Sequence, residues 1–340
     1  MRFATFDHDE EAGRRVRCGV LDDDNLLHLL PAESSLLGLV NAGGDALRAA
    51  GREALDSTPP GPSVADVHLL PPIRPATVRD FVTFEEHVEG VRRSIDRAAG
   101  VPDAWYDAPT FYFTNPYAVI GAHDDIPMPP GSTVLDFELE IAAIIGREGR
   151  DLTPAQARGH IIGYTLFNDW SARDLQSREM QVGLGPCKGK DGATTLGPYL
   201  VTADEVEPYR DRDGFLGIAL EARVNGEVVG RDLLSNMSWT FEEMVAYASR
   251  GTVVRPGDVL GSGTCGNGGC LAELWGVNGG QTPPPLGPGD VVTLTAEGIG
   301  AVSNRVVPGP DLVPLPSARR RPRTRPGQAD AIVGARGSTA

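Results

Sequence analysis

The sequence predicts an α+β fold that is rich in β-strands, and three observations support this prediction. Gly and Pro are abundant, with 42 and 28 of the 340 residues, as is typical of a chain with many turns. Segments with strand character outnumber segments with helical spacing. The two kinds of segment do not alternate regularly along the chain, which disfavours a parallel, doubly wound sheet.

The first 70 residues are predicted to form a small N-terminal β/α domain. Its expected elements are short strands and then one helix, at 2–6, 14–21, 26–30 and 35–54. A segment rich in Pro and Gly, 56–63, is expected to connect this domain, residues 1–70, to the next.

Three later helices are predicted from their start signals. Thr83 and Glu86 fit a capping box, in which each side chain accepts a hydrogen bond from a free backbone amide at the helix start. His87 then falls in the first turn. The same signal occurs at 153–156 and 240–243, the former with proline at the first helical position.

Further strands are predicted at 134–145, 161–168, 217–224, 258–262 and 290–295. The dipeptide Asn225-Gly226 follows one of them and is typical of a hairpin with a type I′ turn, because both residues tolerate a positive φ. These elements together predict a main domain over residues 71–311.

The charge and the apolar pattern exclude several kinds of partner. The formal net charge is −15, from 31 basic and 46 acidic residues, which argues against nucleic acid or an anionic membrane. No apolar run reaches the length of about 18 residues that a spanning helix needs. The first residues have no signal or transit character, so the sequence predicts a cytoplasmic protein.

The four cysteines form no C-x-x-C pair. In a cytoplasmic chain such thiols are expected to be reduced, and the missing ligand pairs disfavour a structural zinc site. Residues 312–340 are mostly Pro, Arg, Ser, Gly and Ala, which predicts a disordered tail. The arginine cluster at 319–325 is also compatible with an arm that binds nucleic acid. The acidic charge of the whole chain favours instead a tail that is simply solvated.

Two glutamates on one predicted strand give the strongest chemical signal. Glu138 and Glu140 are two residues apart, so in a strand they share a face and lie on the order of 7 Å apart. On a strand with one wet face such a pair is usually solvated. The apolar run 141–145 instead indicates burial, where two carboxylates stay ionised only if a cation or water compensates them. The pair therefore predicts a hard metal ion.

These glutamates and several other segments resemble the fumarylacetoacetate hydrolase family. The resemblance covers about residues 75–308, and its most specific run is Asn168-Asp169-Trp170-Ser171-Ala172-Arg173-Asp174-Leu175-Gln176. The other matching segments follow in the family's order: Asp80 to His87, Glu138-Leu-Glu140, 185–191, Gly263-Thr264 and Glu273.

The resemblance implies a mixed β-roll catalytic domain that forms a homodimer and binds a divalent metal. Four acids are implied as the metal ligands: Asp80, Glu138, Glu140 and Asp169. An all-oxygen set suits Mg²⁺, with Ca²⁺ or Mn²⁺ as alternatives, rather than zinc.

The resemblance also implies catalytic and substrate-binding roles. His87, which alone would be an ordinary histidine of a helix, becomes the general base that activates water, oriented by Glu273. Four residues are implied to bind the substrate: Arg173, Gln176, Lys190 and Thr264. Arg173 and Lys190 are also implied in catalysis, because they stabilise negative charge; from spacing alone, Arg173 and Gln176 would equally fit a salt-bridged surface turn.

The implied activity is Mg²⁺-dependent hydrolysis of a carbon–carbon bond in a β-diketo acid of the fumarylacetoacetate or acylpyruvate type, in the catabolism of aromatic compounds. Alternatives on the same fold are a 2-oxo-dienoate hydratase, an isomerase and an oxaloacetate-type decarboxylase. A non-catalytic scaffold that binds a small acid is disfavoured by the full set of acids, base and cations. Val82 and Met180 stand where the family's hydrolases carry tyrosines, which points away from fumarylacetoacetate itself.

One motif is misleading. Residues 261–266 satisfy G-x-G-x-x-G after a predicted strand. No crossover helix and acidic strand end follow, as a dinucleotide site requires, so nicotinamide cofactor binding is not predicted. The loop is instead expected to let the backbone approach a ligand closely.

Overall fold

The computed structural model describes residues 1–10, 13–96 and 99–321. Met1–Pro310 form one compact unit, and the chain from Asp311 on is a separate, second unit. In the second unit, residues 311–321 form neither helix nor strand, and the rest of the predicted tail, 322–340, lies outside the described residues. Within the described ranges, no helix is long and apolar enough to cross a membrane.

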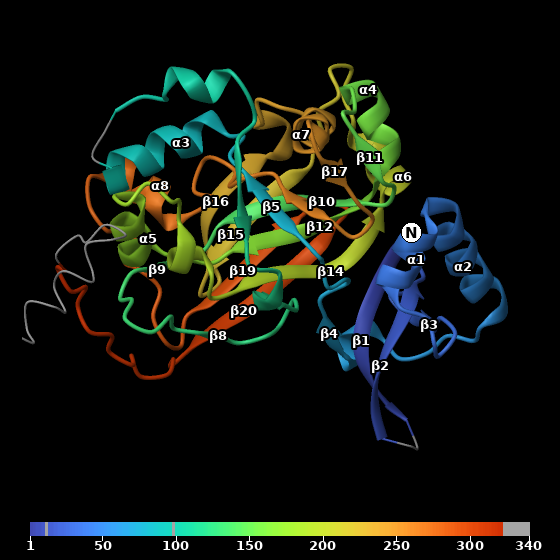
Figure 1. The fold of residues 1–340 in the computed structure, drawn as a ribbon. Helices are drawn as coiled ribbons and strands as arrows, with labels where there is room; N and C mark the ends of the chain where they lie inside the picture. Colours follow the sequence, from blue (N-terminus) through green and yellow to red (C-terminus); the bar gives the residue numbers. More distant parts are fainter. Residues whose placement is uncertain (11–12, 97–98, 322–340) are drawn as a thin grey trace, which may run out of the picture. The chain divides into compact units, whose positions relative to one another are not determined.

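The main sheet of the first unit has eleven strands (Figure 1). Nine of them follow one path: β3 (Leu27–Leu29), β2 (Gly13–Leu21), β1 (Arg2–Glu10), β14 (Thr194–Thr202), β12 (Ile161–Asp169), β10 (Leu139–Ile145), β18 (Val259–Gly261), β5 (Val78–Phe81) and β6 (Phe111–Thr114). Off this path, β4 (His68–Leu70) pairs with β1, and β7 (Val119–Ile120) pairs with β14. The pairing of β1 with β14 joins the N-terminal strands to the main sheet. That residues 1–70 fold as a separate domain stays a prediction.

A second sheet of five strands packs against the first. Its order is β16 (Glu227–Leu233), β15 (Ala219–Val224), β19 (Val291–Ala296), β20 (Gly300–Val307) and β8 (Ile126–Pro127). Two short ribbons pair β9 (Leu135–Asp136) with β13 (Ser171–Ala172), and β11 (Gly149–Arg150) with β17 (Val253–Val254). The predicted hairpin is confirmed between β15 and β16, where Asn225 and Gly226 have φ of 54° and 86°.

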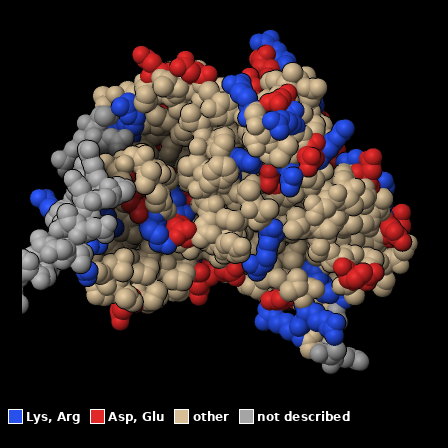
Figure 2. Space-filling view, viewed as in Figure 1, with Lys and Arg blue, Asp and Glu red and all other residues tan. Residues whose placement is uncertain are grey.

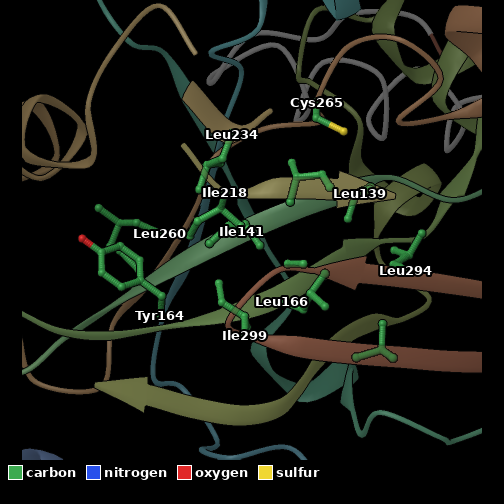
Figure 3. Close-up of a cluster of buried hydrophobic side chains, with 14 of the residues drawn as sticks. Leu139, Ile141, Tyr164, Leu166, Ile218, Leu234, Leu260, Cys265, Leu294 and Ile299 are labelled. Atoms are coloured by element: carbon green, nitrogen blue, oxygen red, sulfur yellow. The ribbon is translucent and has the colours of Figure 1, made fainter. Parts of the chain in front are cut away.

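One of two hydrophobic clusters among the described residues lies between the two sheets (Figure 3), and the other joins α1 (Leu36–Ala42) and α2 (Gly44–Ser57) to the main sheet. Ile141 of β10 and Leu166 of β12 come from the main sheet, and Leu294 of β19 comes from the second. Every residue of β10 is buried, which confirms that the apolar run after Glu140 belongs to an interior strand. Over the face in Figure 2, acidic and basic side chains are interspersed.

The described residues also form eight α-helices, besides short 3₁₀ and π segments: α1 (Leu36–Ala42), α2 (Gly44–Ser57), α3 (Glu85–Val91), α4 (Pro154–Ala157), α5 (Arg173–Met180), α6 (Ala203–Val206), α7 (Phe241–Ser249) and α8 (Leu271–Asn278). The capping boxes before α4 and α7 are confirmed. The helix predicted over 35–54 is interrupted at Gly43, whose φ is 99°.

The capping box predicted at Thr83 is wrong. Helix α3 begins at Glu85, after Phe84, and no side chain caps it. The Thr83 hydroxyl instead donates a hydrogen bond of 2.6 Å to the Ser262 carbonyl. Thr83 is wholly buried, and its hydroxyl therefore needs a partner that the neighbouring strand end supplies. His87 nevertheless lies in the first turn of α3.

Helices α3 and α8 cross at two glycines, near one end of the strands (Figure 1). A Cβ atom at Gly276 of α8 would lie 2.1 Å from the Gly90 carbonyl oxygen. A Cβ atom at Gly90 of α3 would lie 2.5 Å from Cγ of Glu273. The two backbones therefore approach too closely for any other residue, and this crossing sets His87 beside the first turn of α8.

Gly276→Ala is expected to destabilise the protein by about 1–3 kcal/mol, because the new methyl group overpacks the crossing. Helix propensity alone would favour alanine by about 1 kcal/mol, so the predicted sign is opposite to that of an exposed helix position. Urea denaturation measures the change. The control is Gly280→Ala, where a Cβ atom meets nothing within 4 Å; an equal loss in both variants would contradict the crossing as the cause.

Candidate active site and metal centre

Three carboxylates meet around β18. Asp80 lies on β5 and Glu140 on β10, and β18 pairs with both of these strands. At Gly261 of β18, a Cβ atom would lie 2.8 Å from Asp80 Oδ1 and 2.9 Å from Glu140 Oε2. Glu138, directly before β10, completes a buried group whose carboxylate oxygens lie within 4.8 Å of one another. The glycine of this strand therefore leaves the space in which the carboxylates converge.

Asp169, the last residue of β12, joins this group through two shared partners. The Tyr112 hydroxyl donates to Asp80 Oδ2 at 2.7 Å and also contacts Asp169 Oδ2. The Lys190 ammonium lies 2.7 Å from Asp169 Oδ2 and forms an ion pair with Glu138. The structure thus brings all four predicted metal ligands together.

The electrostatics of these acids favour a bound cation. Burial, together with the neighbouring acids, raises the pKa of Asp80 and Glu140 well above the usual range, and burial also raises the pKa of Asp169. Burial opposes ionisation of Glu138 too, but Lys190 and Arg173 outweigh it and lower its pKa to about 2. Uncompensated carboxylates resist ionisation when they are packed together in the interior.

The donor set fits a hard divalent metal. Oδ1 of Asp80 and Oδ1 of Asp169 are buried and have no hydrogen-bond partner among the described residues. Buried acceptors without partners are uncommon, and a cation would satisfy them. All the candidate ligand atoms are carboxylate oxygens, which suit Mg²⁺, Ca²⁺ or Mn²⁺.

Arg173 is buried and bonds mainly to protein acids. Its Nε and Nη2 donate to Asp136 Oδ2 at 2.9 and 2.7 Å, and Nη2 also donates to Glu138 at 2.7 Å. Its Nη1 donates to Gln176 Oε1 at 3.0 Å. Arg173 therefore fixes Glu138 directly, and both Arg173 and Gln176 line the cavity described below.

The glycine-rich loop after β18 contributes backbone to the site. The Gly263 amide donates to Glu140 Oε2 at 2.9 Å, and the Thr264 hydroxyl lies 3.4 Å from Glu140 Oε1. The loop thus approaches a carboxylate of the protein, and Thr264 contacts that carboxylate.

His87 and Glu273 are neighbours, with one donor atom of each within 4.8 Å of the other. Among the residues that the structure describes, no hydrogen bond joins them. His87 Nε2 lies 3.9 Å from Glu138 Oε1, and His87 Nδ1 lies 3.6 Å from Cys270 Sγ. Glu273 Oε1 accepts a hydrogen bond of 3.2 Å from the Gly268 amide. Burial lowers the pKa of His87 to about 4, so the imidazole is neutral near pH 7.

A cavity of about 250 Å³ opens onto these residues. Eight of the ten predicted site residues line it, namely Asp80, His87, Glu138, Glu140, Arg173, Gln176, Lys190 and Thr264. The other two, Asp169 and Glu273, are not among its lining residues. Val82 and Met180, the two positions that lack the expected tyrosines, also line the cavity.

Three residues of the site were missed in the sequence. The Asp136 carboxylate accepts hydrogen bonds from the backbone amides of Leu271 and Ala272, at the start of α8, and from the Arg173 guanidinium. It lies two residues before Glu138, so the same strand period indicated it. Tyr112 gave no local signal, because only the pairing of β6 with β5 sets it opposite Asp80. Cys270 likewise depends on the crossing of α3 and α8.

Lys190→Met is expected to destabilise the metal-free protein by about 3–5 kcal/mol, because it leaves the buried Asp169 without its cation and leaves Glu138 paired with Arg173 alone. Divalent metal should recover part of this loss. Denaturation in EDTA and in Mg²⁺ tests both statements. The matched control is Lys188→Met in the same short 3₁₀ helix, Cys187–Lys190, where the side chain is 71% exposed and pairs with Asp191 at the surface. If the two variants lost equal amounts of stability, Lys190 would not be the counter-ion of the site.

The fold and the site together define a class of protein: mixed-sheet α+β proteins with a buried carboxylate centre. The comparisons agree. The family model described as "Fumarylacetoacetate (FAA) hydrolase C-terminal" matches residues 76–307. The chain belongs to the fumarylacetoacetate hydrolase family, whose members in these comparisons include tautomerases, isomerases and hydrolases.

Two curated relatives span nearly the whole chain. Oxaloacetate tautomerase YisK of Bacillus subtilis is 29% identical over 327 residues, covering 90% of this chain and 100% of the relative. The mitochondrial oxaloacetate tautomerase fahd2 of Xenopus laevis is 30% identical over 317 residues, covering 90% of each. Among solved structures, the fumarylacetoacetate hydrolase of Exiguobacterium antarcticum has a TM-score of 0.70 at 28% identity, covering 91% of this chain and 99% of its own. The α+β, β-rich fold predicted from the sequence is therefore confirmed.

Proposed function

We propose that this protein is a metal-dependent enzyme that converts a β-dicarbonyl 2-oxo acid through its enolate, with hydrolysis of a carbon–carbon bond as the overall reaction. The observation that supports this most is the convergence of Asp80, Glu138, Glu140 and Asp169 at a cavity that also holds His87. A divalent metal bound by these acids would polarise the substrate's carbonyl and carboxylate oxygens.

The protein's own groups would then handle the charge and the proton. The Lys190 ammonium, which also lies 6.0 Å from the centroid of the Tyr112 ring, has three N–H donors. Two of them would serve Glu138 and Asp169, and the third would meet a substrate oxygen. The Arg173–Gln176 pair would orient the substrate's carboxylate from the other side of the cavity. His87 is neutral at pH 7 and can accept a proton from water or from the carbon next to the carbonyl.

A second candidate, tautomerisation of an oxaloacetate-like acid, is favoured by a specific observation. His87 Nδ1 contacts Cys270 Sγ, and Glu273 bonds to the Gly268 amide. Hydrolysis needs a base that is oriented to activate water, whereas keto–enol exchange needs only one proton transfer at carbon and one at the neighbouring oxygen. The two relatives described above, which each cover 90% of this chain, are named oxaloacetate tautomerases.

One experiment separates the candidates. Acylpyruvates, fumarylpyruvate and enol-oxaloacetate are offered with Mg²⁺, Mn²⁺ or Ca²⁺, and the enol absorbance and the products are followed. Hydrolysis yields two acids from an acylpyruvate. Tautomerisation brings enol-oxaloacetate to equilibrium with its keto form faster than the metal alone does, without cleavage. Failure to convert any of these acids with any of the metals would overturn the proposal.

The finer expectations belong to the same proposal. We expect Mg²⁺ as the working metal, a homodimer in the cytoplasm, and substrates that arise from the breakdown of aromatic compounds. The lack of tyrosines at Val82 and Met180 still points to an acyl group other than that of fumarylacetoacetate, although Tyr112 supplies one phenol to the cavity. Light scattering of the purified protein would test the dimer.

A further inference from the structure

A second set of metal-binding side chains lies beside the carboxylate centre. It consists of His87 on α3, Cys270 at the start of α8 and Glu273 in the first turn of α8. One donor atom from each lies within 4.8 Å of the others, and all three residues are buried. None of the four proposed magnesium ligands belongs to this set. Its nitrogen, sulfur and oxygen donors are those of zinc sites and not of magnesium sites.

The separation of the first two donors suits a tetrahedral metal. Cys270 Sγ lies 3.6 Å from His87 Nδ1. For metal–sulfur and metal–nitrogen bonds of about 2.3 and 2.05 Å, ligand atoms at that separation subtend an angle of about 110° at the metal. Without a metal, the same separation suits a weak hydrogen bond between the thiol and the imidazole, whose direction is set by the tautomer of His87. A metal can therefore replace one thiol proton with little movement of either side chain.

Glu273 offers the third donor. Its Oε1 accepts the Gly268 amide, but its Oε2 is buried and has no hydrogen-bond partner among the described residues. A buried acceptor in this state is costly, and a metal beside Cys270 would satisfy it. This orphan oxygen is independent of the contact between His87 and Cys270, and it points to a ligand of the same kind.

The three donors are held in place before any metal arrives. Cys270 Sγ accepts the Glu273 amide at 3.4 Å as the cap of α8. The crossing at Gly90 and Gly276 fixes α3 against α8. His87 also lines the cavity, so a fourth position could be filled by water, as in zinc sites with three protein ligands.

We propose that His87, Cys270 and Glu273 form an inhibitory site for a borderline transition metal such as Zn²⁺ or Co²⁺, distinct from the carboxylate centre. On binding, Cys270 releases its thiol proton to solvent and becomes a thiolate ligand. The metal takes the lone pair of His87 Nδ1, and the ring proton then resides on Nε2, the nitrogen nearest Glu138. His87 can no longer accept a proton, and this inhibitory effect rests on its proposed role as the base.

Cobalt spectroscopy tests the binding without using activity. Co²⁺ added to the full-length protein in excess Mg²⁺ should give a thiolate-to-cobalt charge-transfer band, which carboxylate ligands do not produce. Cys270→Ser should abolish the band while keeping an oxygen that caps α8. Cys265→Ser, at another buried cysteine of the same loop, should retain it. No band in the wild type, or a band that survives in Cys270→Ser, would overturn the site.

Two further measurements complete the test. In a wild-type crystal soaked in ZnCl₂ and MgCl₂, an anomalous zinc peak is expected between the three side chains; zinc at the carboxylates alone would overturn the proposal even if Cys270→Ser failed to fold. The zinc concentration that halves turnover, relative to each protein's own zinc-free rate, should rise at least about tenfold in Cys270→Ser. Zinc bound at the three residues without inhibition would overturn the inhibitory role. If no substrate is found, the band and the zinc peak still decide the site.

Discussion

Glu140→Ala is expected to abolish measurable turnover of any 2-oxo acid while the protein stays folded. Glu140 is buried beside Asp80 and Glu138, and burial with these neighbours raises its pKa well above the usual range. The substitution removes one proposed metal ligand. It also removes a carboxylate that is costly to bury without a cation, which offsets the loss of the acceptor of the buried Gly263 amide, so the metal-free variant should stay close in stability to the metal-free wild type.

Thermal unfolding with and without Mg²⁺ measures the second half of this expectation. A ligand at about 100 times its Kd stabilises a folded protein by about 2.7 kcal/mol, so Mg²⁺ should raise the Tm of the wild type and leave that of Glu140→Ala nearly unchanged. Glu148→Ala is the control, because Glu148 is an exposed acid just beyond the other end of β10. Turnover retained by Glu140→Ala would eliminate the metal mechanism.

His87→Ala is expected to lower kcat by roughly 10²–10⁴-fold, the usual span for the loss of a general base. Mg²⁺ affinity should hardly change, because His87 is not among the proposed ligands of that ion. Glu273→Gln should lower kcat less, because Glu273 lies near His87 but the structure shows no hydrogen bond between these two described residues.

Steady-state kinetics and Mg²⁺ titration by calorimetry separate the two effects. His123→Ala, at an exposed histidine, serves as the control. Full hydrolysis by His87→Ala would refute the base, and would favour the isomerase or decarboxylase alternatives. A large loss of Mg²⁺ affinity would show instead that His87 acts by shaping the carboxylate centre, from which its Nε2 is 3.9 Å away.

The parts of the site that could be predicted are those with a strong local pattern. Glu138 and Glu140 precede a wholly apolar run, so strand period and burial together indicated two interior carboxylates. The capping boxes before α4 and α7 were equally local. At Thr83 the same pattern failed, because a tertiary acceptor, the Ser262 carbonyl, took the hydroxyl.

The remaining parts depend on contacts between distant segments. Tyr112 reaches Asp80 through strand register, and Cys270 reaches His87 through a crossing of two helices that Gly90 and Gly276 permit. Register and helix crossing are set by the whole sheet and core. Neither a single tyrosine in an aromatic strand nor an isolated cysteine in a glycine-rich loop carries that information in its own neighbourhood.

The pairing of β1 with β14 bears on how this protein can be divided. β14 lies between β12 and β1 in the sheet, and its residues Leu200 and Val201 pair with the start of the chain. A fragment that begins at residue 71 would uncover these backbone groups at one end of β14, and an uncovered strand edge is a template for aggregation. The N-terminal strand β1 therefore protects this edge of the sheet. Its removal should lower the solubility of the protein before it lowers the activity.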